Sequence, residues 1–172
     1  MWALLEPVFR AGETFPHDPA ISAAEARLAW VEQSQRVQVA EDAAGAVIGT
    51  AYLRPNSLCL GAHVANAGFV VAEGGRRRGI GSLLCRSVLQ EARLLGYRAM
   101  QFNLVVSTNR AGLACWRRNG FRIVGTLPGA FRHSRLGYVD ALVMMRSLVE
   151  EGSTDPGNDD GAGIRPGAGA GG

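Results

Sequence analysis

The residues with the clearest chemical potential are three consecutive arginines, Arg76 to Arg78, followed by Gly79 and Gly81. They stand between a short apolar stretch and a long amphipathic one. The first backbone N–H groups of a helix have no partner within the helix, and the helix dipole adds partial positive charge there. An arginine-rich turn that leads into a helix is therefore a receptor for a polyanion, most plausibly a pyrophosphate.

Two common phosphate-binding patterns do not fit this turn. A Walker P-loop needs GxxxxGK followed by Ser or Thr, and in an alignment that begins at Gly74, Ile80 and Gly81 replace the lysine and the hydroxyl residue. A dinucleotide fingerprint needs GxGxxG, and Leu84 occupies the position of the third glycine. The pattern that remains is RxxGxG, placed between a strand and a helix.

Hydrophobic periodicity predicts the elements that position this turn. In chain order we expect helices at 3–11, 22–33, 79–95 and 109–118, and strands at 36–41, 46–53, 62–71, 99–106, 121–127 and 138–146. Residues 128–137 are expected to form a loop, and Ser22 with Glu25 fits a capping box. This order predicts an α/β domain with a mixed, mostly antiparallel central sheet flanked by helices.

Two of the predicted strands have distinctive features. Gly68 interrupts the strand over 62–71, where a glycine marks a bulge or a close approach by another part of the chain. In the strand over 99–106, period-two alternation predicts two faces. One face would carry Met100, Phe102 and Leu104, and the other would carry Gln101, Asn103 and Val105.

The composition limits the class of protein. A chain of 172 residues that is 47% hydrophobic can bury one sizeable core. The formal net charge is +3, an excess too small and too dispersed to indicate a nucleic-acid-binding protein. Residues 152–172 are rich in Gly, Asp and Ala and are expected to be disordered, which leaves residues 1–151 as the folded domain.

The three cysteines indicate the compartment. Cys59, Cys85 and Cys115 form no CxxC pair, and an odd number argues against a disulfide framework or a zinc site. No apolar run reaches the roughly 18 residues that a membrane span requires, and no signal peptide is evident. We therefore expect a cytoplasmic protein with no metal ion and no membrane partner.

The RxxGxG turn resembles the (Q/R)xxGx(G/A) motif of the GCN5-related N-acetyltransferases. A second stretch, NRAGLACWRRNGF over 109–121, resembles the family's downstream pattern: an asparagine at a helix start, an aromatic residue and a closing Gly-Phe. The two motifs lie in the order and spacing that the family uses. The resemblance covers roughly residues 36–148.

The resemblance implies an acetyl-CoA-dependent N-acetyltransferase, with acetyl-CoA as cosubstrate and direct attack by the acceptor amine. The pantetheine arm would pair with the strand near Phe69, a backbone N–H near Val70 would face the thioester carbonyl, and Asn109 would lie near the reactive end. The implied cofactor contacts are Phe69, Val70, Val71, Arg76, Arg77, Arg78, Gly79, Ile80, Gly81, Ser82 and Asn109.

The segments 65–69 and 101–105 resemble a narrower group, the proline-analogue and amino-acid acetyltransferases. It includes the fungal enzymes that acetylate azetidine-2-carboxylate. In that group asparagines that match Asn66 and Asn103 contact the small amino-acid substrate. The resemblance thus implies Asn66 and Asn103 as catalytic and substrate-binding residues, with Phe69 as a further substrate contact. Asn66 could instead satisfy a local turn, and Phe69 could be core.

The sequence departs from the family's pattern in two places. A helix is predicted almost at Met1, where the family usually begins with a strand, so we expect the N-terminal edge strand to be missing. Trp116 stands where many members carry a tyrosine that protonates the departing thiolate, and an indole cannot do this. No general base is obvious. The titratable candidates are Glu73, His63, His133 and Asp140.

Other functions remain open at this stage. The acceptor could be a protein N-terminus or an aminoglycoside instead of a small amine, although a polycationic drug should prefer an acidic cleft to neutral asparagines. The missing tyrosine would also suit a non-catalytic CoA-binding module. Nucleic-acid binding through the arginine turn lacks the interleaved aromatic residues that such a site normally has. We expect a small-molecule partner and a possible homodimer.

Overall fold

The computed structural model describes residues 1–75 and 78–149. Arg76 and Arg77, two of the expected cofactor contacts, lie outside the described residues. So does the segment 150–172, which contains the expected domain boundary and tail.

The described helices and strands follow the predicted order closely. They are α1 (Trp2–Ala11), α2 (Ala23–Arg27) continued by the π-helical turn η1 (Leu28–Glu32), β1 (Arg36–Glu41), β2 (Val47–Pro55), β3 (Val64–Val71), α3 (Ile80–Leu94), β4 (Ala99–Val106), α4 (Arg110–Arg118), β5 (Arg122–His133) and β6 (Gly137–Ser147). Short 3-10 turns lie at Cys59–Gly61 and Glu73–Gly75. No strand precedes α1 in the described chain.

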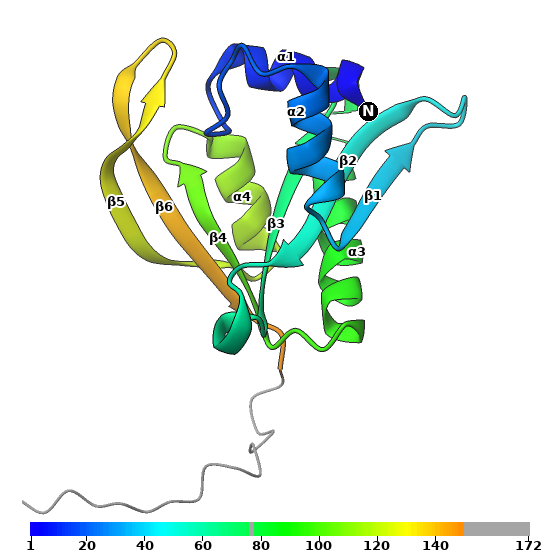
Figure 1. Cartoon of the computed structure of the whole chain (residues 1–172), viewed down its shortest axis with the longest axis vertical. Coiled ribbons are helices and arrows are strands. Elements are labelled where there is room, and N and C mark those ends of the chain that lie inside the picture. The colour runs from blue at the N-terminus through cyan, green and yellow to red at the C-terminus, as the bar shows by residue number, and fades with distance from the viewer. Residues whose placement is uncertain (76–77, 150–172) are drawn as a thin grey trace, which may run out of the picture.

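Within the described residues, six strands form one sheet in the order β1-β2-β3-β4-β6-β5. Neighbouring strands are antiparallel except for β3 and β4, which are parallel. Helices α1 and α2 cover one face of the sheet, and α3 and α4 cover the other (Figure 1). The mixed, mostly antiparallel sheet with flanking helices is therefore confirmed.

Each face of the sheet has its own hydrophobic core. On the α3 face, Val88 and Leu89 pack with Met100 and are almost fully buried. On the α1 face, Phe9 and Trp30 are 2% and 1% exposed. Each such side chain stabilises the fold by about 1.5–3 kcal/mol of apolar burial. The sheet is thus held from both sides, and its strands are fixed in place.

The parallel strands β3 and β4 pair over a very short distance. Their ladder contains two residue pairs, Val64 with Ala99 and Ala65 with Met100. Beyond these pairs the strands diverge toward their C-terminal ends (Figure 1). The backbone groups on this side of β3 are consequently left without the strand partner that a continuous sheet would give them.

Gly68 marks a close approach by a side chain. The β2–β3 ladder runs without a register shift from Gly49–Val71 to Pro55–Ala65, so β3 has no bulge at Gly68. A Cβ atom at Gly68 would lie 2.3 Å from Cε1 of Tyr52. The ring of Tyr52 therefore lies over Gly68, and its other contact is the ring of Trp30, with centroids 4.8 Å apart.

The predicted alternation in β4 is wrong beyond Asn103. The β4–β6 register shifts between Phe102 and Val105, and Val105 is 7% exposed and packs in the same core as Phe102. This irregularity adds a residue to β4, so that the residues after it change faces. Val105 thus belongs to the core, whereas Leu104, expected there, is half-buried.

The predicted loop over 128–137 is also largely wrong, because β5 continues to His133. The β5–β6 register shifts between Leu127 and Phe131, and Gly129 in this irregularity has φ 59°. Pro128 is tolerated because β5 is the outermost strand, where a missing N–H can face away from the ladder. The carboxylate of Asp140 accepts a hydrogen bond of 2.9 Å from the N–H of Gly129.

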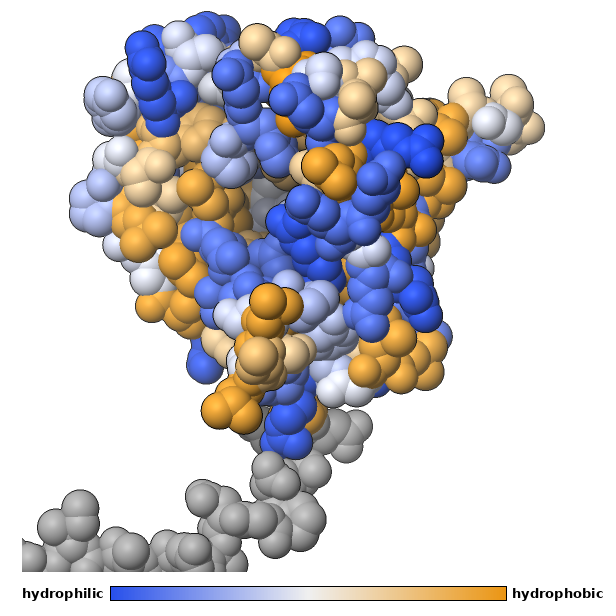
Figure 2. All heavy atoms as spheres, viewed as in Figure 1, coloured by the Kyte–Doolittle hydropathy of each residue, from blue (hydrophilic) through white to orange (hydrophobic). Residues whose placement is uncertain are grey.

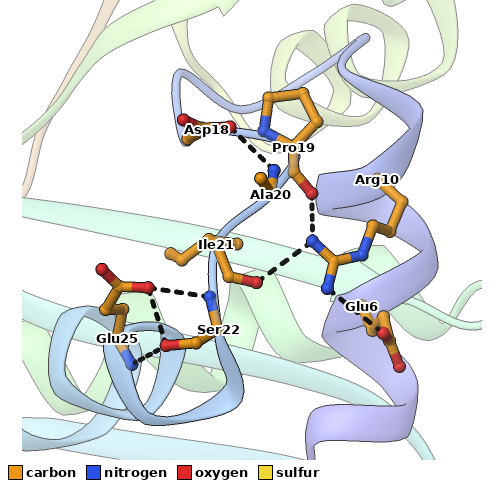
Figure 3. Close-up of polar contacts among 8 residues, drawn as sticks. All are labelled: Glu6, Arg10, Asp18, Pro19, Ala20, Ile21, Ser22 and Glu25. Atoms are coloured by element: carbon orange, nitrogen blue, oxygen red, sulfur yellow. Dashed lines mark hydrogen bonds and ion pairs between the residues drawn. The ribbon is translucent and has the colours of Figure 1, made fainter.

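The segment between α1 and α2 is fixed at its ends (Figure 3). The guanidinium of Arg10 donates to the carbonyl oxygens of Pro19 and Ile21, the latter at 3.1 Å. At the start of α2, the predicted capping box between Ser22 and Glu25 is confirmed. These contacts hold residues 12–22 against the end of α1.

The same segment contacts the β5–β6 hairpin. The backbone N–H of Ser134 donates to the carbonyl oxygen of Gly12 at 3.0 Å, and its hydroxyl donates to that of Ala11 at 2.6 Å. The hairpin tip and the end of α1 therefore form a bridge across one face of the sheet. No helix in the described part of the chain is long and apolar enough to cross a membrane.

Substitution of Gly68 by alanine tests the packing of Tyr52. The added methyl group would displace the ring, so Gly68→Ala should lower the free energy of unfolding by about 1–3 kcal/mol in urea denaturation. Gly125→Ala is the matched control, because its Cβ would meet only Val143 at 3.9 Å. Equal stability of the two variants would contradict the described position of Tyr52.

Candidate cofactor and acceptor site

The start of α3 presents free backbone donors. Gly79 caps this helix in a left-handed conformation with φ 82°, and Leu83 makes the hydrogen bond to its carbonyl oxygen at 2.9 Å. The N–H groups of Ile80, Gly81 and Ser82 lie in the first turn, ahead of that bond. Arg78 is exposed beside them. This geometry suits a polyanion, as the sequence indicated.

Gly81 joins the helix start to the end of β3 and to α4. A Cβ atom at Gly81 would lie 3.8 Å from Cγ2 of Val71 and 3.6 Å from Sγ of Cys115. The structure therefore brings together two of the expected cofactor segments, the end of β3 and the turn at 79–82. The absence of a side chain keeps this junction shallow.

The side chain of Ser82 is used within the protein. Asn119, which is 6% exposed, donates from Nδ2 to Oγ of Ser82 at 3.3 Å and to the carbonyl oxygen of Cys115 at 2.8 Å. This contact fastens the start of α3 to the end of α4. Only the backbone of Ser82 is then free for an anion. Sequence reasoning treated Asn119 as a helix end and missed this role.

Asn109 is the N-cap of α4. Its Oδ1 accepts a hydrogen bond of 3.0 Å from the N–H of Gly112. A cap of this kind stabilises a helix by about 1 kcal/mol. The capping alternative for Asn109 is thus confirmed, and its contact with a cofactor stays a prediction.

Aromatic residues line the α4 side of the gap between β3 and β4. The ring of Trp116 lies 4.8 Å from Phe69 and 4.9 Å from Phe102, measured between centroids. Phe102 stacks in turn on Phe121 at 4.3 Å. Trp116 is therefore a packing residue in the described structure. Phe69 is half-buried at the edge of the gap, as a cofactor wall would be.

Backbone alternation in β3 decides which groups face the gap. Ala72 donates to the carbonyl oxygen of Ile48 at 2.9 Å, so Ala72 and every second residue before it direct their backbone groups toward β2. Val70, expected to face the thioester carbonyl, belongs to this set. The N–H groups that point toward the gap are those of Phe69 and Val71.

Asn66 closes the ladder between β3 and β4. Its Nδ2 donates to the carbonyl oxygen of Gln101 at 2.9 Å, and its Oδ1 accepts from the hydroxyl of Tyr52 at 3.3 Å. Asn66 is 8% exposed. In a continued parallel ladder the carbonyl of Gln101 would accept from Ala67, so the amide of Asn66 takes the place of a backbone donor where the strands separate.

Asn103 lies on the same face, further along β4. Its Oδ1 accepts from Nε2 of Gln101 at 2.8 Å, and its Nδ2 donates to Oδ1 of Asn56 at 2.7 Å. The two predicted asparagines are thus connected through Gln101. Sequence reasoning missed Tyr52, Asn56 and Gln101, because nothing local in the sequence indicates that they meet.

The surface is hollowed over this region. Viewed as in Figure 1, Figure 2 shows a depression between the β5–β6 hairpin and the α1–α2 layer, over the diverging strands. Hydrophilic residues form much of its rim. The depression lies on the face where Asn66 and Asn103 meet, which makes it the candidate acceptor site.

The four titratable candidates have other environments. The imidazole of His63 lies 3.1 Å from the carbonyl oxygen of Leu60, and that of His133 accepts from the N–H of Arg135 at 3.1 Å. Asp140 holds Gly129 in β5. Glu73 is exposed in the turn before α3. Three of the four are therefore engaged in local structure.

The thiols do not form a nucleophilic centre. Burial, with a smaller contribution from Cys115, raises the pKa of Cys85 to about 12, which keeps this thiol protonated at neutral pH. All three cysteines are free. Among the described residues, no group of three or more His, Cys, Asp or Glu side chains is placed to hold a metal ion.

Comparison with known proteins agrees with this arrangement. The model of the acetyltransferase (GNAT) family matches residues 1–121. A curated relative, the N-acetyltransferase aca1 of Schizosaccharomyces pombe, is 35% identical over 98 residues, covering 56% of this chain and 47% of the relative. The chain thus matches about half the length of that relative.

Solved structures extend the likeness to β5 and β6. A GCN5-related N-acetyltransferase from Kribbella flavida is 42% identical, with a TM-score of 0.81 over 86% of this chain and 89% of that one. A phosphinothricin acetyltransferase from Sinorhizobium meliloti in complex with acetyl-CoA has the same fold at 22% identity, with a TM-score of 0.77 over 91% of this chain and 86% of that one.

The resemblance stated from the motifs is therefore confirmed at the level of the family. The family model spans the diverging strands, the turn before α3 and α4, which are the elements that form the site. This chain belongs to the acetyltransferase (GNAT) family.

Proposed function

We propose that the chain is an acetyl-CoA-dependent N-acetyltransferase that acetylates the amine of a small molecule, with amino acids or proline analogues as the acceptor class. The observation that carries the proposal is the separation of β3 from β4 beside the start of α3. A free strand edge and a helix start with unpaired N–H groups are the two features that an extended amide chain ending in a pyrophosphate requires.

The cofactor side of the site follows from these two features. The N–H groups of Gly79 to Ser82 bind the pyrophosphate, and the positive charge of Arg78 adds to the helix dipole. The free edge of β3 pairs with the amides of the pantetheine arm as an added strand would. Asn66 ends the ladder with β4, so this edge stays open from Ala67 to Val71.

The residues around the gap then position the reaction. A gap-facing N–H group, from Phe69 or Val71, donates to the oxygen that becomes negative when the amine attacks the thioester. Trp116 and Phe69 exclude water from one side of the acetyl group. A free thiol has a pKa of about 8.5, so the thiolate departs without a tyrosine to protonate it. Positioning of the two substrates is the main contribution of the protein.

The acceptor side is lined by neutral polar groups. Asn66, Asn103, Gln101 and Tyr52 offer amides and a phenol, and no carboxylate is hydrogen-bonded to any of them in the described structure. Such a lining favours a small, hydrogen-bonding amine over a polycationic drug. Asn66 and Asn103 are the residues that we propose to orient the acceptor.

A bulky residue at the start of α3 should abolish cofactor binding. Saturating acetyl-CoA should raise the melting temperature of the wild-type protein by about 5–10 °C, and Gly81→Trp should remove this shift. Gln90→Trp adds the same indole to an exposed position far from the helix start and should keep the shift. An unchanged melting temperature of the wild-type protein with acetyl-CoA would refute the cofactor assignment.

A panel of acceptors tests the proposed reaction. Thiol release from acetyl-CoA should be fastest with amino acids and proline analogues such as azetidine-2-carboxylate, and slower with aminoglycosides and peptides. Asn103→Ala should lower kcat/KM for the preferred acceptor about tenfold, through the loss of one or two hydrogen bonds, while the acetyl-CoA shift is kept.

Each outcome of the panel has a distinct meaning. Thiol release with peptides alone would replace the small-molecule acceptor by a protein N-terminus. Binding of acetyl-CoA without thiol release for any acceptor would favour the non-catalytic CoA-binding module. A variant Asn103→Ala that loses the acetyl-CoA shift would move Asn103 to the cofactor side.

A further inference from the structure

Arg54 lies next to the candidate acceptor site. It is half-buried near the end of β2, and its Cα is opposite that of Asn66 in the β2–β3 ladder. Its guanidinium carbon lies 4.8 Å from the centroid of the Tyr52 ring. Because Tyr52 donates to Asn66, only one side chain separates Arg54 from the point where β3 and β4 diverge.

Arg54 differs from other arginines of the described chain in its partners. Carboxylates pair with Arg10 (Glu6), Arg27 (Glu32), Arg36 (Glu91) and Arg135 (Glu13). Within residues 1–75 and 78–149, Arg54 has an aromatic ring and no carboxylate partner. A partly desolvated cation without a counter-ion favours the binding of an anion, and a guanidinium matches the two oxygens of a carboxylate.

The surroundings of Arg54 reinforce its preference for an anion. His17 lies close enough for the charge of Arg54 to act on it. Burial and, to a lesser extent, this charge lower the pKa of His17, so its imidazole is neutral at pH 7. The segment that carries His17 is held by Arg10 through the carbonyls of Pro19 and Ile21 (Figure 3). Arg54 is thus the charged group on this part of the rim.

The chain also connects Arg54 to the second asparagine of the site. Asn56, two residues further on, accepts the hydrogen bond from Asn103. Arg54 therefore lies near the supports of both residues that we propose to orient the acceptor. An α-amino acid carries its carboxylate one carbon from its amine, so a cation at this rim would fix the carboxylate while the amine faces the gap.

We infer that Arg54 binds the carboxylate of the acceptor and restricts the enzyme to amino-acid-like acceptors. This inference rests on the proposed function, because it assigns a substrate class to the same site. Arg54 acts as a specificity-determining residue, and the stacked ring of Tyr52 keeps its guanidinium planar to the sheet edge. The alternative is that Arg54 only packs on Tyr52, and it makes different predictions.

Equilibrium binding separates the two alternatives without requiring turnover. The probes are N-acetylproline and N-acetylalanine, together with their carboxamides, which keep the shape and lose the charge. Titration calorimetry with the protein–CoA complex should show binding of the acids about ten- to hundredfold tighter than that of the amides. Arg54→Gln should reduce the affinity for the acids to that for the amides.

Two further variants control this experiment. Arg122→Gln removes the same charge from an exposed position at the start of β5 and should bind the acids as the wild type does. Arg54→Lys keeps the charge and loses the planar fork, so it should still prefer the acids at reduced affinity. An imidazole NMR spectrum should show a shift of His17 with the acids and no shift of His63.

The inference fails if the wild-type protein binds acids and amides equally, or binds no acid at millimolar concentration. It also fails if Arg54→Gln keeps the preference, or if that variant and Arg122→Gln are affected alike. A preserved preference for the acids together with no thiol release in the acceptor panel would instead overturn the proposed function and leave the carboxylate site in place.

Discussion

The site depends on one constraint, the early end of pairing between the only parallel strands of the described sheet. Two residue pairs join β3 to β4, and the side chain of Asn66 then bonds the carbonyl of Gln101 in place of a backbone donor. An open edge inside a sheet costs free energy, because its backbone groups have lost their partners. The sheet tolerates the gap because both strands are fixed on their other sides, β3 by β2 and β4 by β6.

The two faces of the sheet divide the work of the site. The α3 face holds the start of α3, Asn119 and the aromatic residues around Trp116, and we assign the cofactor to this side. The α1 face holds Tyr52, Asn66 and Arg54, and we assign the acceptor to it. The gap connects the two faces, so an acetyl group placed in it would be accessible from both.

The sequence predicted what depends on local chemistry. The RxxGxG turn, the capping box at Ser22 and the order of helices and strands follow from residue types at short spacing. The contacts of Tyr52, Asn56 and Arg54 are formed across strands, and no local pattern predicts them. The irregularities in β4 and β5 were missed for a similar reason, since alternation describes a regular strand and the partner strand decides where it is interrupted.

Hydrogen exchange of individual backbone amides tests the central claim most directly. In the free protein the amides of Phe69 and Val71 face the gap and should exchange rapidly, whereas that of Val70 is protected by its bond to β2. Addition of acetyl-CoA should protect Phe69 and Val71 and leave Val70 unchanged. Exchange at Phe69 and Val71 that is slow in the free protein, or unaltered by saturating acetyl-CoA, would contradict the open edge of β3 as the cofactor site.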